Sequence, residues 1–120
     1  MAFPRRSERR VALVARRVAT LDAIAAGERD FRRIVEASRS VATDDEHDPE
    51  GVGLAVERAL IVASLERARD RLGEVDRALE RLDSGRYGRC EDCGRAIGAE
   101  RLVVRPAARN CIDCARGSTR

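Results

Sequence analysis

The sequence predicts a mainly α-helical protein built as an antiparallel coiled-coil helical hairpin with a small cysteine-rich domain at its base. Two long stretches show helical spacing of apolar residues, an acidic segment with a proline separates them, and four cysteines gather in the last third of the 120 residues. Aromatic residues make up only 2% of the chain and charged residues 38%. Such a composition excludes a thick globular interior and favours elongated helices.

The first predicted helix runs from a cap at Ser7 to about residue 41 and contains no proline. Its apolar residues fall into two stripes that are slightly offset from each other. The first stripe is Val11, Val14, Val18, Leu21 and Ala25, and the second is Ile24, Phe31, Ile34, Val35 and Val41. We interpret them as one long amphipathic helix with a stutter near Gly27.

The second predicted helix has a coiled-coil seam without a break. Its seam residues alternate steps of four and three, and they are Ile61, Leu65, Ala68, Leu72, Val75, Leu79 and Leu82, with Leu54 one heptad earlier. Asp48 as cap and Pro49 in the first turn suit its start. Its end is predicted at Asp83-Ser84-Gly85, where Gly85 suits a left-handed conformation after the helix.

A short acidic turn at residues 44–50 joins the two helices, which we therefore expect to fold back on each other. A dimer of two straight helices is the competing geometry. The stretch Pro-Glu-Gly-Val-Gly at 49–53 argues against a helix that continues through it, so the hairpin is preferred. The spacing leaves open whether the seams bury against each other within one chain or between chains.

The net charge of +3 hides a strong segregation along the chain. Residues 1–43 carry ten arginines and five acidic residues, whereas residues 44–50 carry five acidic residues and no basic one. Residues 51–84 are nearly neutral, with six arginines and seven acidic residues, and residues 85–120 carry eight arginines against four acidic residues. The acidic turn therefore separates two basic regions.

A cytoplasmic location is expected from the absence of export and membrane signals in the sequence. No run of 18 apolar residues is present, which excludes a transmembrane helix. The apolar run at residues 11–15 stops at Arg16 and is too short for a secretory signal. In the reducing cytoplasm, four cysteines are expected to bind a metal rather than to form disulfides.

Two C-x2-C pairs, Cys90 with Cys93 and Cys111 with Cys114, are separated by 17 residues. Each pair can direct two thiolates at one ion, and four thiolates suit a single Zn²⁺. Gly88 before the first pair and Gly94 after it permit the turns that such knuckles need. Four cysteine ligands leave no open coordination position, so the zinc should be structural.

The predicted fold is thus a hairpin over residues 1–84, with its acidic tip at 44–50, and a C4 zinc-finger (zinc-knuckle) domain with a short tail over residues 85–120. The finger offers few side chains for a core of its own: Tyr87, Ile97, Leu102, Val103, Val104 and Ile112. A segment this small normally needs a metal to fold. No catalytic triad or phosphate-binding loop is present in the sequence, and we predict no enzyme.

Residues 79–115 closely resemble the DksA/TraR family of C4-type zinc-finger regulators that bind bacterial RNA polymerase. The resemblance rests on the stretch from Leu82 to Gly94, on Arg101-Leu102, on Arg105-Pro106 and on Cys111-Ile112-Asp113-Cys114. It is moderate over the acidic turn and only architectural over residues 1–43. The family's coiled-coil hairpin enters the secondary channel of the polymerase and places acidic tip residues near the catalytic centre.

The resemblance implies a transcription regulator that binds RNA polymerase without sequence-specific DNA contacts and does not associate with a membrane. The family's tip motif is Asp-x-x-Asp-x-Ala, which identifies Asp45 and Asp48 as the polymerase-contacting residues here. Glu50 stands where the family has alanine. The sequence points to no particular small-molecule effector.

Three other interpretations remain beside this one. The arginine-rich ends fit a nucleic-acid-binding C4 zinc finger, which would make the tip carboxylates dispensable. The cysteines could instead form a thiol redox sensor that loses zinc on oxidation. Finally, the acidic turn could be a solvated loop, and Arg9, Arg10, Arg16 and Arg17 a solvated face of the first helix.

Overall fold

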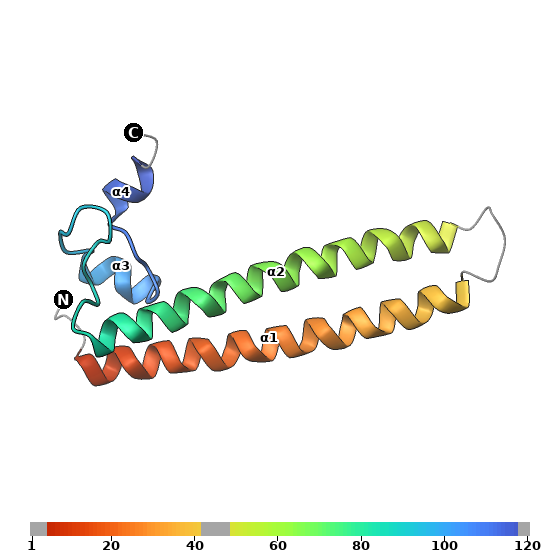
Figure 1. The fold of residues 1–120 in the computed structure, drawn as a ribbon, viewed down its shortest axis with the longest axis horizontal. Helices are drawn as coiled ribbons and strands as arrows, with labels where there is room; N and C mark the ends of the chain where they lie inside the picture. The colour runs from red at the N-terminus through yellow and green to blue at the C-terminus, as the bar shows by residue number, and fades with distance from the viewer. Residues whose placement is uncertain (1–4, 42–48, 118–120) are drawn as a thin grey trace. The chain divides into compact units, whose positions relative to one another are not determined.

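The computed structural model describes residues 5–41 and 49–117. Its helices are α1 (Arg6–Val41), α2 (Pro49–Asp83), α3 (Ala99–Val104) and α4 (Ile112–Arg116). The chain forms two compact units, which we call the finger unit (Met1–Val18 and Leu72–Arg120) and the hairpin unit (Ala19–Arg71). In each unit α1 and α2 run antiparallel and side by side (Figure 1), which confirms the predicted helical hairpin.

The two units divide the long helices between them. The finger unit joins the first turns of α1 and the last turns of α2 with the cysteine-rich segment. The compact units do not follow the boundary at residue 84, so the division into a hairpin (1–84) and a finger (85–120) stays a prediction. None of the helices in the described ranges is long and apolar enough to cross a membrane.

Helix α1 begins at Arg6, and its cap is Arg5, two residues before the predicted cap at Ser7. The Arg5 carbonyl accepts the hydrogen bond from the Arg9 N–H at 2.9 Å. The Arg5 N–H in turn donates to the carboxylate Oε2 of Glu8 at 3.2 Å. Ser7 lies inside the helix, so its assignment as the cap was wrong. The acidic side chain three residues after Arg5 satisfies the free N–H group instead, as in one half of a capping box.

Helix α2 ends as the sequence predicted, at Asp83, and Gly85 has a φ of 77°. The Arg86 N–H donates to the Arg81 carbonyl at 2.8 Å, and the Gly85 N–H donates to the Leu82 carbonyl at 3.4 Å. These two bonds form a Schellman motif, which requires a left-handed residue at Gly85. The motif reverses the chain and directs it into the finger.

The packed face of α1 contains most of the second predicted stripe but little of the first. Val11, Val14, Val18 and Leu21 are between 39% and 69% exposed. One series with steps of four and three and no stutter is buried or partly buried, and it consists of Leu13, Arg17, Thr20, Ile24, Gly27, Phe31 and Ile34. Its members Ile24, Phe31 and Ile34 belong to the second predicted stripe. Arg17 and Thr20 are polar, so counting apolar residues selected the wrong face in the first half of the helix.

The packed face of α2 is the predicted seam. Leu65, Ala68, Val75 and Leu82 are buried, and the remaining members of the series are half-buried. Ala78, which the spacing did not include, is also fully buried. The apolar periodicity identified this face correctly because nearly all its positions carry large aliphatic side chains.

Ion pairs connect the helices beside these seams. In the finger unit, Arg17 Nε donates to Asp76 at 2.7 Å, and Arg10 bonds Asp83. In the hairpin unit, Arg69 lies 3.2 Å from the carboxylate of Glu28. Arg10 and Arg17 therefore face α2, so describing them as part of a solvated arginine face was wrong. These pairs are partly exposed, so each one adds only about 0.2–1 kcal/mol to the free energy of unfolding.

At Gly27, α1 and α2 approach each other closely in the hairpin unit. A Cβ atom at Gly27 would lie 2.7 Å from Cδ2 and 3.0 Å from Cγ of Leu65. Leu65 is itself 6% exposed, so its side chain has little room to move. The missing side chain of Gly27 thus forms the recess that receives Leu65.

We expect Gly27→Val to lower the free energy of unfolding by about 1–3 kcal/mol, because the added atoms overpack the recess occupied by Leu65. The matched control is Gly73→Ala in α2, where a Cβ atom would meet nothing closer than 3.8 Å. This control should raise stability by about 1 kcal/mol through helix propensity alone. Urea denaturation followed by circular dichroism measures both, and equal stability of the valine variant and the wild type would contradict the assignment.

Candidate metal centre

The cysteine-rich segment and the ends of the long helices share one hydrophobic core in the finger unit. From the helices come Leu13, Val75, Ala78 and Leu82, and from the finger come Tyr87, Cys90, Ile97, Leu102 and Cys111. Three further residues that we expected in this core, Val103, Val104 and Ile112, are 53%, 72% and 47% exposed. That expectation was wrong because α3 buries only Leu102 and α4 buries none of its residues.

The first cysteine knuckle is a tight turn that two glycines make possible. Gly88 and Gly94 have φ values of 86° and 76°, as the sequence predicted. The Gly94 N–H donates to the Cys90 carbonyl at 2.9 Å, and the Cys90 N–H donates to the Arg95 carbonyl at 2.8 Å. A further bond from the Ile97 N–H to the Gly88 carbonyl, at 2.8 Å, closes the turn.

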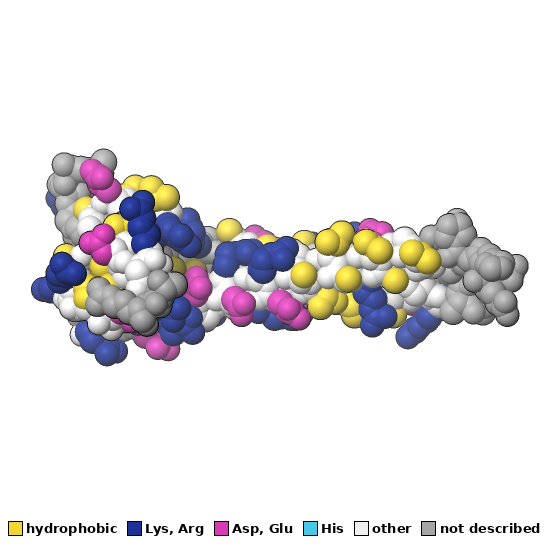
Figure 2. All heavy atoms as spheres, turned by 90° about the horizontal axis from the view of Figure 1, so that it is seen from above, with side chains coloured by type: hydrophobic (Ala, Val, Ile, Leu, Met, Phe, Trp, Pro, Cys, Tyr) yellow, Lys and Arg dark blue, Asp and Glu magenta, His cyan; other side chains and the backbone are white. Residues whose placement is uncertain are grey.

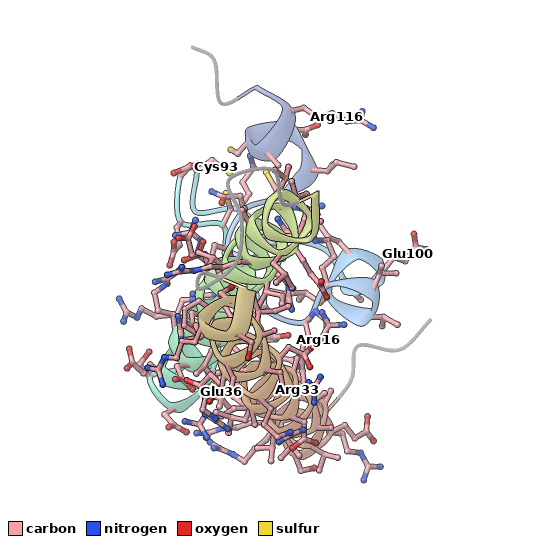
Figure 3. All side chains as sticks on the ribbon, turned by 90° about the vertical axis from the view of Figure 1, so that its right-hand side faces the viewer. Arg16, Arg33, Glu36, Cys93, Glu100 and Arg116 are labelled. Atoms are coloured by element: carbon pink, nitrogen blue, oxygen red, sulfur yellow. The ribbon has the colours of Figure 1, made fainter. Side chains whose placement is uncertain are left out.

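The second knuckle uses the start of a short helix. Cys111 precedes α4 in an extended conformation, and its sulfur accepts a hydrogen bond from the Cys114 N–H at 3.4 Å. One helical turn therefore brings Cys114 back beside Cys111. Figure 3 shows Cys93 of the first knuckle next to α4, which carries Cys114.

The four cysteine sulfurs converge on one point. The Sγ atoms of Cys90, Cys93, Cys111 and Cys114 all lie within 4.8 Å of one another. Cys93 Sγ and Cys111 Sγ are 3.8 Å apart, far beyond a disulfide bond. A Zn–S bond of about 2.3 Å gives a tetrahedron with edges of about 3.8 Å, so the donor set and its spacing fit one Zn²⁺.

The environment of the thiols favours deprotonation at Cys90 and Cys93, whose pKa values are lowered, and opposes it at Cys114. Burial acts to raise the pKa of Cys90, but hydrogen bonds from the backbone of Cys111, Cys93 and Asp92 outweigh it and lower the pKa to about 6. Hydrogen bonding to the Cys111 sulfur, and to those of Cys90 and Cys93, raises the pKa of Cys114 to about 12. The four neighbouring sulfurs therefore retain a proton, which a bound cation would replace.

Zinc affinity should consequently rise with pH across the neutral range. The metal must displace the proton of Cys114, so its apparent affinity should increase at least about tenfold per pH unit between 7 and 8. Below the Cys90 pKa of about 6, the proton of Cys90 also competes and the dependence should steepen. Competition titrations with a chromophoric chelator from pH 5 to 8 measure this slope. An affinity independent of pH would contradict the thiol environment described.

Comparison with known proteins places this centre in a family. Residues 85–120 match the prokaryotic dksA/traR C4-type zinc finger. The structure of transcription factor DksA2 from Pseudomonas aeruginosa superposes with a TM-score of 0.77 at 26% identity, covering 95% of this chain and 82% of that one. The chain belongs to the DksA/TraR family. Its four-cysteine centre is accordingly a zinc site of the DksA/TraR type.

Two further DksA/TraR relatives are named RNA polymerase-binding transcription factor DksA. The protein from Escherichia coli K12 is 31% identical over 99 residues, which are 70% of this chain and 66% of that protein. The protein from Haemophilus influenzae is 36% identical over 87 residues, 68% of this chain and 60% of that protein. The chain therefore aligns with about 60–66% of the length of these relatives.

Two of the predicted functional residues, Asp45 and Asp48, lie outside the described residues. Around the DksA/TraR zinc site, the structure adds contacts that the sequence did not predict. The Tyr87 hydroxyl donates to the Pro106 carbonyl at 2.6 Å, Arg9 stands 5.5 Å from the Tyr87 ring centre, and burial raises the pKa of Tyr87. Arg81, at the end of α2, is buried beside the knuckles. No periodicity or motif signals these contacts, because their partners are distant in sequence.

Proposed function

We propose that this chain is a transcription regulator that binds bacterial RNA polymerase through its secondary channel, with Asp45 and Asp48 at the contact. The relatives named RNA polymerase-binding transcription factor support this proposal, because they align with 70% and 68% of this chain. The observation that carries it is the core that joins the finger to the ends of both helices. A finger packed there holds these helix ends together, while the acidic turn connects the other ends of the same helices.

Zinc has a structural role in this proposal, with Cys90, Cys93, Cys111 and Cys114 as its ligands. Four thiolates fill the coordination sphere, so no position remains for a substrate or an activated water. The regulator then acts by contact rather than by catalysis, and it does so in the cytoplasm, where the polymerase is. Sequence-specific DNA contacts are not part of the mechanism.

An exposed apolar stripe on α2 further supports a partner for the hairpin unit. Val52, Val56 and Leu60 are 69%, 57% and 65% exposed. Hydrophobic side chains are visible on this part of the hairpin in Figure 2. Residues 51–65 contain only two charged residues, Glu57 and Arg58. Contiguous apolar surface of this kind is typical of interaction sites, and here it follows the acidic turn directly along the chain.

Replacing the two tip carboxylates, in Asp45→Asn/Asp48→Asn, should abolish the effect of the protein on promoter-complex lifetime while core polymerase is still retained in a pull-down. The charge at the tip acts inside the channel, whereas other surfaces of the protein contribute to binding. The matched control is Asp22→Asn/Asp70→Asn, which neutralises two exposed carboxylates on the helices. Unchanged lifetimes with the tip variant, compared with this control, would contradict the role of Asp45 and Asp48.

Nucleic-acid binding by the finger is a second candidate function. The guanidinium groups of Arg89, Arg105 and Arg109 are on exposed residues and form no ion pair within the described part of the chain. Unpaired arginines on a small zinc domain suit phosphate contacts.

If the finger binds nucleic acid, its affinity for duplex DNA should fall steeply with salt, with a slope close to one per phosphate contact. Replacing Arg89, Arg105 and Arg109 with glutamine should flatten that slope, and the tip variant should bind DNA like the wild type. Fluorescence anisotropy at several salt concentrations measures both. Undetectable binding at about 50 mM salt, where phosphate contacts are strong, would exclude this second candidate.

A further inference from the structure

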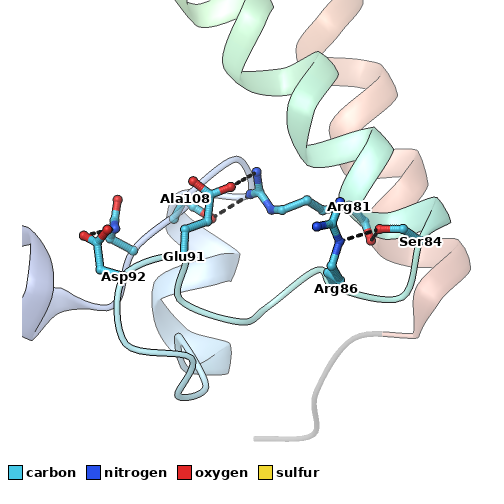
Figure 4. A network of polar contacts seen from close by, with 7 residues as sticks. Arg81, Ser84, Arg86, Glu91, Asp92 and Ala108 are labelled. Atoms are coloured by element: carbon cyan, nitrogen blue, oxygen red, sulfur yellow. Dashed lines mark hydrogen bonds and ion pairs between the residues drawn. The ribbon is translucent and has the colours of Figure 1, made fainter.

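Arg81 is a buried cation at the end of α2, and its side chain contacts both halves of the finger. Arg81 is 6% exposed. Its Nη1 donates to Oε2 of Glu91 at 3.2 Å, and its Nη2 donates to the Ala108 carbonyl at 3.2 Å (Figure 4). Its own carbonyl accepts the bonds from Arg86 and Tyr87 that end the helix. One residue thus belongs to the helix end by its backbone and to the finger by its side chain.

The two partners of Arg81 lie next to the cysteine ligands. Glu91 stands between Cys90 and Cys93 in the first knuckle, and Ala108 is three residues before Cys111. Two other contacts join the same segments: the Glu91 N–H donates to the Arg109 carbonyl at 2.9 Å, and Asn110 Nδ2 donates to Asp92 at 2.6 Å. The latter bond is exposed, whereas the Arg81 side chain is only 7% exposed.

The hydrogen bonding of Arg81 is incomplete, which argues against a role in stability alone. Its Nε is buried and has no hydrogen-bond partner among residues 5–41 and 49–117. The carboxylate of its ion-pair partner is 41% exposed. A buried cation satisfied only in part is a poor source of stability compared with an apolar side chain of similar size. Its fixed fork of donors, in contrast, defines how two chain segments lie relative to each other.

We propose that Arg81 is a positioning residue for the metal centre, which holds the two knuckles in register before the ion binds. The 17 residues between Cys93 and Cys111 must be ordered for four sulfurs to meet. If these residues are already ordered in the metal-free protein, metal binding does not carry the entropic cost of ordering them. Arg81 supplies it by attaching the first knuckle and the approach to the second knuckle to the same turn of α2. This role concerns the zinc site and is independent of the polymerase.

The test compares Arg81→Met with Arg86→Met in the full-length protein. Methionine matches the length of the arginine stem, and its introduction leaves no buried unpaired charge because Glu91 is partly exposed. Arg86 is exposed and bonds Ser84 rather than a knuckle. Competition with a chromophoric chelator should show zinc binding about 10–100-fold weaker for Arg81→Met, the usual effect of losing a residue that supports metal ligands. Arg86→Met should bind like the wild type.

Hydrogen exchange of the metal-free proteins separates positioning from general stability. In Arg81→Met the Glu91 amide, which donates to Arg109, should lose its protection. The Ser84 amide, which donates to Glu80 at the end of α2, should keep its protection. Equal loss at both amides would mean that the helix end has melted, and would overturn the proposal.

Two other results would also overturn it. One is a zinc affinity of Arg81→Met indistinguishable from that of Arg86→Met, and the other is a wild-type protein that binds no zinc. If Arg81→Met does not fold, Glu91→Gln decides, since it removes the charge of the partner from a partly exposed position. Weakened zinc binding in this variant, with unchanged helix content, supports the proposal, and wild-type affinity rejects it.

Discussion

The core that the finger shares with the ends of α1 and α2 is the constraint on which the finger unit depends. Tyr87, Ile97 and Leu102 are too few to exclude water by themselves, and they are buried only because Leu13 and Val75 complete the layer. Two of the four cysteines belong to the same layer. Metal binding and helix packing therefore stabilise one common core, which explains why α3 and α4 can remain short and largely exposed.

The sequence predicted α2 better than α1 for a physical reason. The seam of α2 is aliphatic almost throughout, so its spacing identifies the buried face. The seam of α1 contains Arg17, Thr20 and Gly27; an ion pair with Asp76 accommodates the arginine, and the side chain of Leu65 fills the space beside the glycine. These partners lie on the other helix and are invisible in a local pattern. In the first half of α1, exposed apolar residues such as Val11 and Val18 were consequently mistaken for its core.

The same distinction separates the predicted parts of the metal centre from the others. The four cysteines and the turns at Gly88 and Gly94 follow from local spacing, because the geometry of a knuckle is local. The position of the second knuckle against the first depends on contacts between Glu91, Ala108 and Arg81, which come from three different segments. Sequence spacing predicts which atoms bind the ion, but it does not predict which contacts bring the two cysteine pairs together.

Two contacts specify the register of α1 against α2 in the hairpin unit. A heptad seam alone allows two helices to slide by seven residues with little loss of apolar contact. Here the recess at Gly27 accepts Leu65, and Arg69 meets Glu28 one turn further along. A shift of one heptad would place either Arg58 or Leu72 against the recess and would separate the charged pair. The packing at Gly27 and the Arg69–Glu28 pair together therefore fix the register of α1 against α2 in the hairpin unit.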